Sequence, residues 1–292
     1  MEKIYGTIIE INASDRTFVI QTKQKKMRLY MQRAMHNKLG KYLAPNHRIY
    51  CVIESPTHFK CEKRYVIHHI QMIKQVASQR PVILFNQKNI EIETKQLINH
   101  LQYTMFLDLE MSMHPYRVDK SFVQEIIQVG YILSDANNQV VERYQTYIQP
   151  TVHKTLTKRT LKFLDLTQEN VDNGITFQEF YNHFNNVIQR FKPAIIVWGK
   201  NDQIGLKDAC KINQLPSLNR STRFINLLQL HKNVFLLKDD LGLMNAYALY
   251  EPPIHKNQRH DAYEDAKMTQ KIFSGFKSVL NQERKISTDH LI

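Results

Sequence analysis

The first 80 residues are dominated by short runs in which hydrophobic and polar positions alternate. Such runs, rich in β-branched and aromatic residues, predict strands. A longer stretch with helical spacing ends at Gly40, with Pro45 after it, and predicts a short helix. The expected order is three strands, a helix and two strands, over residues 3–12, 16–22, 27–32, 33–45, 47–55 and 63–75.

This order of elements is that of an OB-fold barrel, whose strands 2 and 3 present an oligonucleotide-binding face. Basic and aromatic side chains are expected on that face: Arg16, Phe18, Lys25, Lys26, Arg28, Tyr30 and, as a further candidate, Tyr65. Aromatic rings stack on bases, and cations follow the phosphate backbone. The alternative is that the aromatic residues fill a small barrel core and that the lysines are only solvated.

The pattern changes after residue 103, where buried-looking strands alternate with amphipathic helices. We expect strands over 104–111, 125–133, 140–150 and 193–199, and helices over 177–191, from 200 onward and from Asp261, which would be the N-cap of the last helix. This is a mixed α/β pattern. The expected organisation is a basic, β-rich domain over 1–80, a linker over 81–102, an α/β domain over 103–280 and a tail over 281–292.

The uneven distribution of charge along the chain supports two parts with different roles. The 292-residue chain carries a formal net charge of +13, and residues 1–80 contribute +10 of it, from 15 basic and 5 acidic residues. A strongly basic segment favours polyanionic partners such as nucleic acid, although an ordinary basic protein remains the alternative.

The cysteines and the hydrophobic runs indicate the cellular compartment in which the protein is expected. Three cysteines without C-x-x-C spacing form neither a disulfide framework nor a zinc site, which fits a reducing compartment. The start of the chain lacks the apolar core of a signal peptide, and no apolar run could cross a bilayer. We therefore expect a cytoplasmic protein with no membrane association.

Two acids on one strand point to the chemistry. Asp108 and Glu110 are two positions apart, so both side chains lie on one face of a strand. Two like charges about 4 Å apart repel by about 4 kcal/mol at an effective dielectric of 20, so the pair is unfavourable unless a cation is bound. Further along are Asp202, after a buried strand, and His260 and Asp265, at the start of the last helix. Each acid alone would be unremarkable, but the set is what a two-metal phosphoryl-transfer site requires.

These segments resemble the DEDDh 3′→5′ exonucleases, the superfamily of proofreading subunits, RNase T and the Eri-type and KapD-like enzymes. The resemblance covers about residues 103–275 and rests on FLDLEMS (106–112), EIIQVG (125–130), VWGKNDQ (197–203) and HDAYEDA (260–266). Asp165 stands where that family usually has glycine. The resemblance implies an RNase H-like mixed-sheet domain.

The resemblance also implies a role for each site residue. Asp108, Glu110, Asp202 and Asp265 would bind two Mg²⁺ or Mn²⁺ ions, with Asp108 between them, and His260 would be the general base. Met111 and Ser112 would touch the last nucleotide.

The activity implied is hydrolysis of single-stranded nucleic acid from its 3′ end to nucleoside monophosphates, with RNA slightly favoured over DNA. Two alternatives remain open. One is an exonuclease in DNA proofreading or repair, and the other is a nucleic-acid-binding protein that has lost catalysis.

Overall fold

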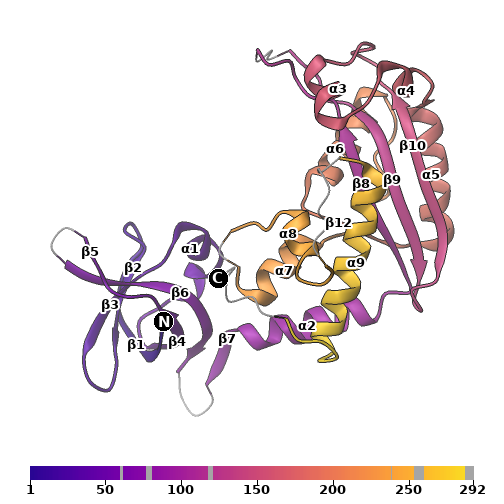
Figure 1. The fold of residues 1–292 in the computed structure, drawn as a ribbon. Coiled ribbons are helices and arrows are strands. Elements are labelled where there is room, and N and C mark those ends of the chain that lie inside the picture. Colours follow the sequence, from indigo (N-terminus) through magenta and orange to yellow (C-terminus); the bar gives the residue numbers. More distant parts are fainter. Residues whose placement is uncertain (60–61, 77–80, 118–120, 238, 253–259, 287–292) are drawn as a thin grey trace. The chain divides into compact units, whose positions relative to one another are not determined.

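The computed structural model describes residues 1–59, 62–76, 81–117, 121–237, 239–252 and 260–286 (Figure 1). The chain divides into two compact units, Met1–Glu93 and Thr94–Ile292, each of which is described by itself. Within the described residues, no helix is long and apolar enough to span a membrane. Cys61 lies outside the described residues, and Cys51 and Cys210 are free and buried.

The first unit is built mainly of strands. The predicted order of three strands, a helix and two strands is present as β1, β2, β3, α1, β4 and β6. A 3-10 turn follows α1, and two additional strands were not predicted. The elements are β1 (Glu2–Asn12), β2 (Thr17–Gln21), β3 (Lys26–Tyr30), α1 (Arg33–Leu39), η1 (Gly40–Tyr42), β4 (His47–Ile53), β5 (Thr57–Phe59), β6 (Glu62–Gln75) and β7 (Val82–Asn86).

The sheet of the first unit curls back on itself. Its strands follow the order β3-β2-β1-β4-β6-β5, and β3 also pairs in parallel with β6, where Leu29 lies opposite Tyr65. Residues such as Ile8, Leu29 and Ile49 are fully buried inside the curl. The unit therefore has its own hydrophobic core.

Phe18 does not lie on the face where the sequence placed it. It is only 2% exposed and packs in the core of the first unit. Arg16 has a positive φ of 53° in the turn before β2. Four consecutive residues of β2, from Thr17 to Ile20, are buried, so this strand offers no exposed face on which Phe18 could lie.

The segment expected as a linker is ordered. Residues 82–86 form β7, which pairs antiparallel with β6, and α2 (Gln87–Asn99) follows directly. The hydrophobic positions of β7 are half-exposed, so its sequence lacks the contrast between two faces by which a strand is recognised.

The second unit contains a mixed sheet with the order β11-β10-β9-β8-β12-β13. β8 and β9 are antiparallel, as are β9 and β10, whereas β12 lies parallel to β8 and β13 lies parallel to β12. The strands are β8 (Tyr103–Met111), β9 (Ile126–Asp135), β10 (Val140–Gln149), β11 (Ile175–Thr176), β12 (Ala194–Val197) and β13 (Arg223–Asn226). The predicted mixed α/β architecture is confirmed.

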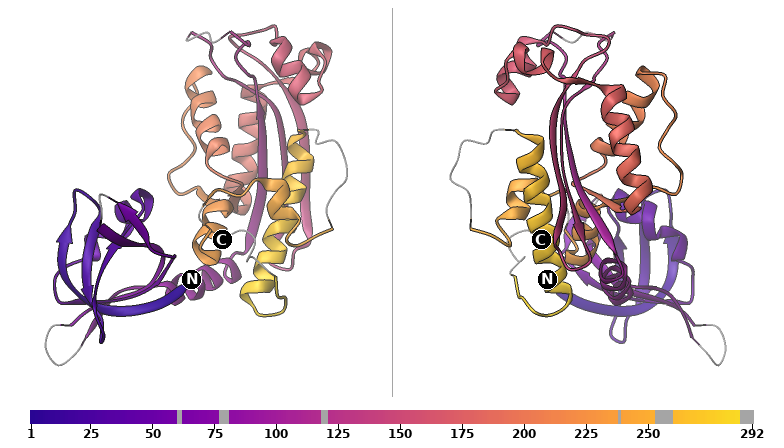
Figure 2. Two further views of the ribbon diagram at one scale, coloured as in Figure 1. Left: turned by 60° about the vertical axis from the view of Figure 1, so that its left-hand side comes forward. Right: turned by 90° about the vertical axis from the view of Figure 1, so that its right-hand side faces the viewer.

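Helices cover both faces of this sheet. The last helix packs on β8 and β9 from one face, and α5 and α6 lie on the opposite face (Figure 2). The helices are α3 (Lys158–Leu164), α4 (Gln168–Asp172), α5 (Phe177–Phe191), α6 (Asn201–Ile212), α7 (Leu227–Phe235), α8 (Leu243–Tyr247) and α9 (Ala262–Leu280). The helix predicted over 177–191 coincides with α5, whose aromatic residues Phe177, Phe180 and Phe184 are buried.

Asp165 shows why glycine would suit its position. It ends α3 in the left-handed conformation, with φ 53° and ψ 45°. Glycine adopts this conformation without strain, and aspartate tolerates it better than most residues. The chain therefore keeps this helix end without the glycine.

Candidate active site

The strand β8 carries the first two acids. Asp108 and Glu110 lie on one face, on either side of the buried Leu109, as the two-residue spacing predicted. Both carboxylates are partly buried, and β8 is held between β9 and β12 in the middle of the sheet. The two like charges are therefore fixed on a rigid strand.

Asp202 reaches the same region from the first turn of α6. It is 6% exposed, and its Oδ1 accepts a hydrogen bond of 3.1 Å from the backbone N–H of Leu109. This bond connects the start of α6 to the strand residue between Asp108 and Glu110. A hydrogen bond between residues 93 positions apart, Leu109 and Asp202, thus holds the acids of the two elements close together.

The start of α9 supplies the remaining residues. Asp261 is the N-cap, as predicted, and accepts hydrogen bonds of 3.0 Å from the N–H groups of Tyr263 and Glu264. Asp265 lies in the first turn of this helix and is 7% exposed. The cap therefore sets the direction in which Asp265 enters the site.

Gln128 was not predicted from the sequence, although it holds the same helix start. It is completely buried on β9, its Nε2 donates to Asp261 Oδ2 at 2.8 Å, and its Oε1 accepts from the Ala262 N–H at 3.3 Å. A single glutamine on a hydrophobic strand gives no periodic signal. The sequence feature that could have found it is a polar residue in an otherwise apolar run.

His260 faces two of the carboxylates. Its Nδ1 lies 3.9 Å from Glu110 Oε1 and 4.0 Å from Asp265 Oδ2. One potential ligand atom from each of these three residues lies within 4.8 Å of the other two. On its other side, the His260 ring stacks on Phe163 of α3, with 4.4 Å between ring centroids and 18° between planes. Phe163 was also not identified from the sequence.

The burial and crowding of the acids raise their pKa values. Burial, together with the charges of Asp265 and Asp202, raises the pKa of Glu110 to about 8. Burial and the neighbouring acids raise the pKa of Asp265 to about 7, and burial raises the pKa of Asp202 to about 6 although the Leu109 N–H opposes it. The pKa of Asp108 is also raised, by burial and then by Asp202, Asp265 and Glu110.

This donor set suits a hard divalent cation. Four carboxylates converge, and each is made more basic by burial or by the others, so an ion that binds them relieves a real electrostatic strain. Carboxylate oxygens without thiolate ligands favour ions such as Mg²⁺ or Mn²⁺ over soft metals.

The two residues predicted to touch substrate differ in their placement. Met111 is half-buried, and its sulfur faces Gly205 of α6. Ser112 is 2% exposed, and its Oγ accepts a hydrogen bond of 2.9 Å from the Glu125 N–H. The Ser112 hydroxyl therefore joins the end of β8 to the residue before β9, and its burial keeps it away from a substrate.

Comparisons with known proteins agree with this geometry. The family model described as "Exonuclease" (RNase_T) matches residues 105–273. The chain is 31% identical to the probable 3′-5′ exonuclease KapD of Bacillus subtilis over 171 residues, which are 58% of this chain and 82% of KapD. It is 24% identical to ERI1 exoribonuclease 2 of Xenopus laevis over 123 residues, which are 42% of this chain but only 18% of that relative.

A solved structure supports the same fold. The nuclease domain of 3′hExo, described as a DEDDh family member bound to rAMP, matches with a TM-score of 0.55 and 18% identity, over 64% of this chain and 97% of that domain. The second unit thus has the RNase H-like fold of these nucleases. The family model covers the segments that carry the four acids and His260, and with the KapD relative it shows that the chain belongs to the RNase_T family of 3′→5′ exonucleases.

Proposed function

We propose that this protein is a metal-dependent 3′→5′ exonuclease that shortens single-stranded nucleic acid and releases nucleoside monophosphates, with RNA slightly favoured over DNA. One observation carries the proposal: Asp108, Glu110, Asp202 and Asp265 converge with raised pKa values, and His260 lies within 4.0 Å of two of them. No structural purpose of the sheet requires four acids at this place.

The four carboxylates of Asp108, Glu110, Asp202 and Asp265 would hold two Mg²⁺ or Mn²⁺ ions. When bound, such ions polarise the phosphodiester and stabilise the charge that develops during its cleavage. Asp202 is fixed by the Leu109 N–H, and Asp265 by the capped start of α9. The protein thus holds its ligands in place before substrate arrives.

His260 would act as the general base. Burial lowers its pKa, so the imidazole is neutral near pH 7 and can accept the proton of the attacking water. The ring is held by its stack on Phe163, with Nδ1 directed toward the carboxylates. Met111 remains a candidate for contact with the last nucleotide.

The first unit would be an OB-like domain that holds the strand. Its element order and the parallel pairing of β3 with β6, which closes the curled sheet, support this assignment. Arg16 and Arg64 lie 5.7 and 4.5 Å from the Tyr30 ring centroid. Lys25 and Lys63 lie 5.8 and 5.6 Å from that of Tyr65. Aromatic rings bordered by cations are the chemistry that single-stranded nucleic acid requires.

Two relatives favour RNA. One is named as an exoribonuclease, and 3′hExo is described in a complex with a ribonucleotide, rAMP. Their identities of 24% and 18% make this a preference to test.

The test is degradation of 5′-labelled single-stranded RNA and DNA of the same sequence by the full-length protein, in Mg²⁺, in Mn²⁺ and in a chelator. We expect stepwise shortening from the 3′ end with either ion, and faster shortening of RNA. Asp108→Asn should abolish it, while Asp208→Asn, a surface acid on α6 that pairs with Lys211, should not.

If Asp108→Asn keeps more than about a tenth of wild-type turnover, a barrier difference below about 1.4 kcal/mol, the assigned site is wrong. Binding by the wild type without metal-dependent shortening would instead favour a silent binding protein.

A further inference from the structure

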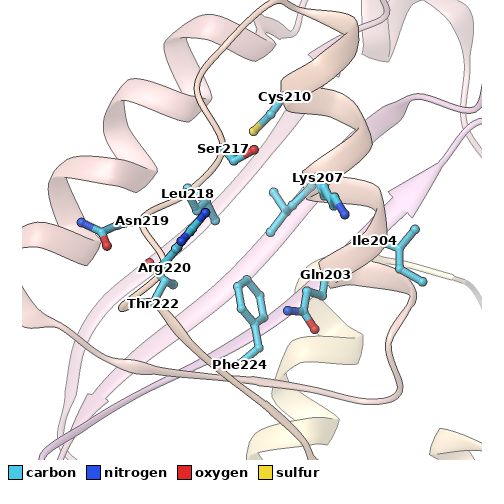
Figure 3. Close-up of a pocket in the computed structure, with 11 residues that line it drawn as sticks. Gln203, Ile204, Lys207, Cys210, Ser217, Leu218, Asn219, Arg220, Thr222 and Phe224 are labelled. Atoms are coloured by element: carbon cyan, nitrogen blue, oxygen red, sulfur yellow. The ribbon is translucent and has the colours of Figure 1, made fainter.

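A pocket of about 420 Å³ lies in the second unit, between α6 and the segment 217–224 that leads into β13 (Figure 3). None of the four acids lines it, but Gln203, at one end, directly follows Asp202. Pockets of roughly 300–1,000 Å³ are the usual size for a small-molecule ligand. The pocket could hold one nucleotide next to the start of α6.

Two cations stand on opposite walls of this pocket. Lys207 projects from α6, and Arg220 projects from the facing segment (Figure 3). Both residues are exposed, and no carboxylate of the described residues lies within 4.0 Å of either side chain. None of the described residues that line the pocket is acidic. A guanidinium and an ammonium on two walls of one pocket are complementary to a phosphate.

The rest of the lining is mostly apolar. Leu218 and Phe224 are half-buried and border the space between the cations and the sheet (Figure 3). A flat base can pack on such a surface, because every base has an apolar face that tolerates different sequences. This apolar wall therefore complements the base of a nucleotide.

We propose that this pocket binds a nucleotide, with its phosphate between Lys207 and Arg220 and its base against Leu218 and Phe224. The nucleotide is either a free nucleoside monophosphate or one unit of a bound single strand. Only the second form rests on the proposed function. Nucleotide binding itself requires no hydrolysis at the carboxylate site.

Binding is measured with the full-length Asp108→Asn protein, so that no probe is degraded. The probes are AMP and labelled single-stranded oligonucleotides of adenine, both ribo and deoxyribo. The test variant adds K207Q and R220Q. A matched control adds K211Q and R223Q, which remove the same charge from α6 and from the start of β13 but lie outside the pocket lining.

We expect the pocket variant to weaken binding of at least one probe by about tenfold, as loss of charge-assisted phosphate contacts should, and the control by less than about threefold. Weakening of AMP and oligonucleotides together identifies a free-nucleotide site, whereas weakening of oligonucleotides alone identifies a strand unit. Equal weakening by both variants, or none by either, would overturn the proposal. Turnover of wild-type protein is assayed separately, so a failure of the proposed activity remains distinguishable.

Discussion

Gly130 on β9 lies directly opposite Asp108 on β8 in the antiparallel ladder. A Cβ atom at Gly130 would overlap the backbone nitrogen of Tyr263 and the carbonyl carbon of Ala262. Both atoms belong to the first turn of α9, the helix that carries Asp265. The bare backbone of Gly130 therefore lets this helix approach the sheet closely enough for acids from two elements to meet.

Gly130→Ala should accordingly displace the start of α9. Overpacking of this kind typically destabilises a protein by about 1–3 kcal/mol. We also expect kcat/KM to fall by at least about a hundredfold, because a displacement near 1 Å at a reacting centre has an effect of that order.

Gly242→Ala is the matched control. Its φ of −63° suits alanine, and a Cβ there meets nothing within 4 Å. Thermal unfolding and oligonucleotide hydrolysis of both variants are the measurements. Wild-type activity in Gly130→Ala would show that the close approach is not needed for catalysis.

A second prediction concerns stability without metal. The pKa of Glu110 rises to about 8 and that of Asp265 to about 7 on folding, so between pH 6.5 and 8 the folded protein holds protons that the unfolded chain does not. The free energy of unfolding in a chelator should therefore fall as pH rises through this window, by up to about 1.4 kcal/mol per pH unit for each proton involved.

Below this pH window, histidines with lowered pKa values change the free energy of unfolding in the opposite direction. Burial lowers the pKa of His69 to about 4 and that of His231 to about 3, so their contribution to stability increases with pH below about 6.5 and is constant above it. Denaturant titrations with and without Mg²⁺ are the measurement, and Glu110→Gln should flatten the slope. A slope that is the same in both proteins would contradict the raised pKa of Glu110.

A third prediction separates the role of His260 from that of Phe163, the ring that stacks on it. His260→Ala should reduce kcat by about 10² to 10⁴-fold, which is the usual contribution of a general base. Phe163→Ala removes the ring that stacks on the imidazole and should reduce kcat by a smaller factor, of about tenfold.

The double variant is decisive, because Phe163 is proposed to act through His260. If so, the double variant should be no slower than His260→Ala alone, since effects of residues that act as a unit do not add. Additive losses would show that Phe163, which is 48% exposed, contacts the substrate independently of His260.

The acids of the site were accessible from the sequence because each lies at a position with a regular signal. Asp108 and Glu110 follow the two-residue period of a strand, and Asp265 follows a capped helix start. Gln128 and Phe163 were not found, because their roles come from contacts with Asp261 and His260, 133 and 97 positions away along the chain. Such contacts depend on tertiary packing, which no local pattern encodes.

The first unit illustrates the same limit. Its order of elements follows from alternation, but alternation does not predict that four consecutive residues of β2, Phe18 among them, are buried. Strand β7 was missed because its pairing with β6, and not a buried face, defines it. Tertiary packing therefore decides which side chains of this unit are available to a ligand.

The last prediction tests those available side chains. Lys25 and Lys63 both lie near the Tyr65 ring on the exposed side of the first unit. If they neutralise phosphates, K25Q/K63Q should reduce the slope of log affinity against log salt for single-stranded RNA by up to about 1.4, since each phosphate contact contributes about 0.7. Tyr65→Leu should instead weaken affinity by about 1–3 kcal/mol with an unchanged slope, because base stacking releases no counterions.

The matched control, K88Q/K95Q, removes two charges from α2 and should leave both the affinity and the salt slope close to those of the wild type. Equal slopes for K25Q/K63Q and K88Q/K95Q would mean that the first unit attracts nucleic acid only through its net charge, without a defined path for the strand.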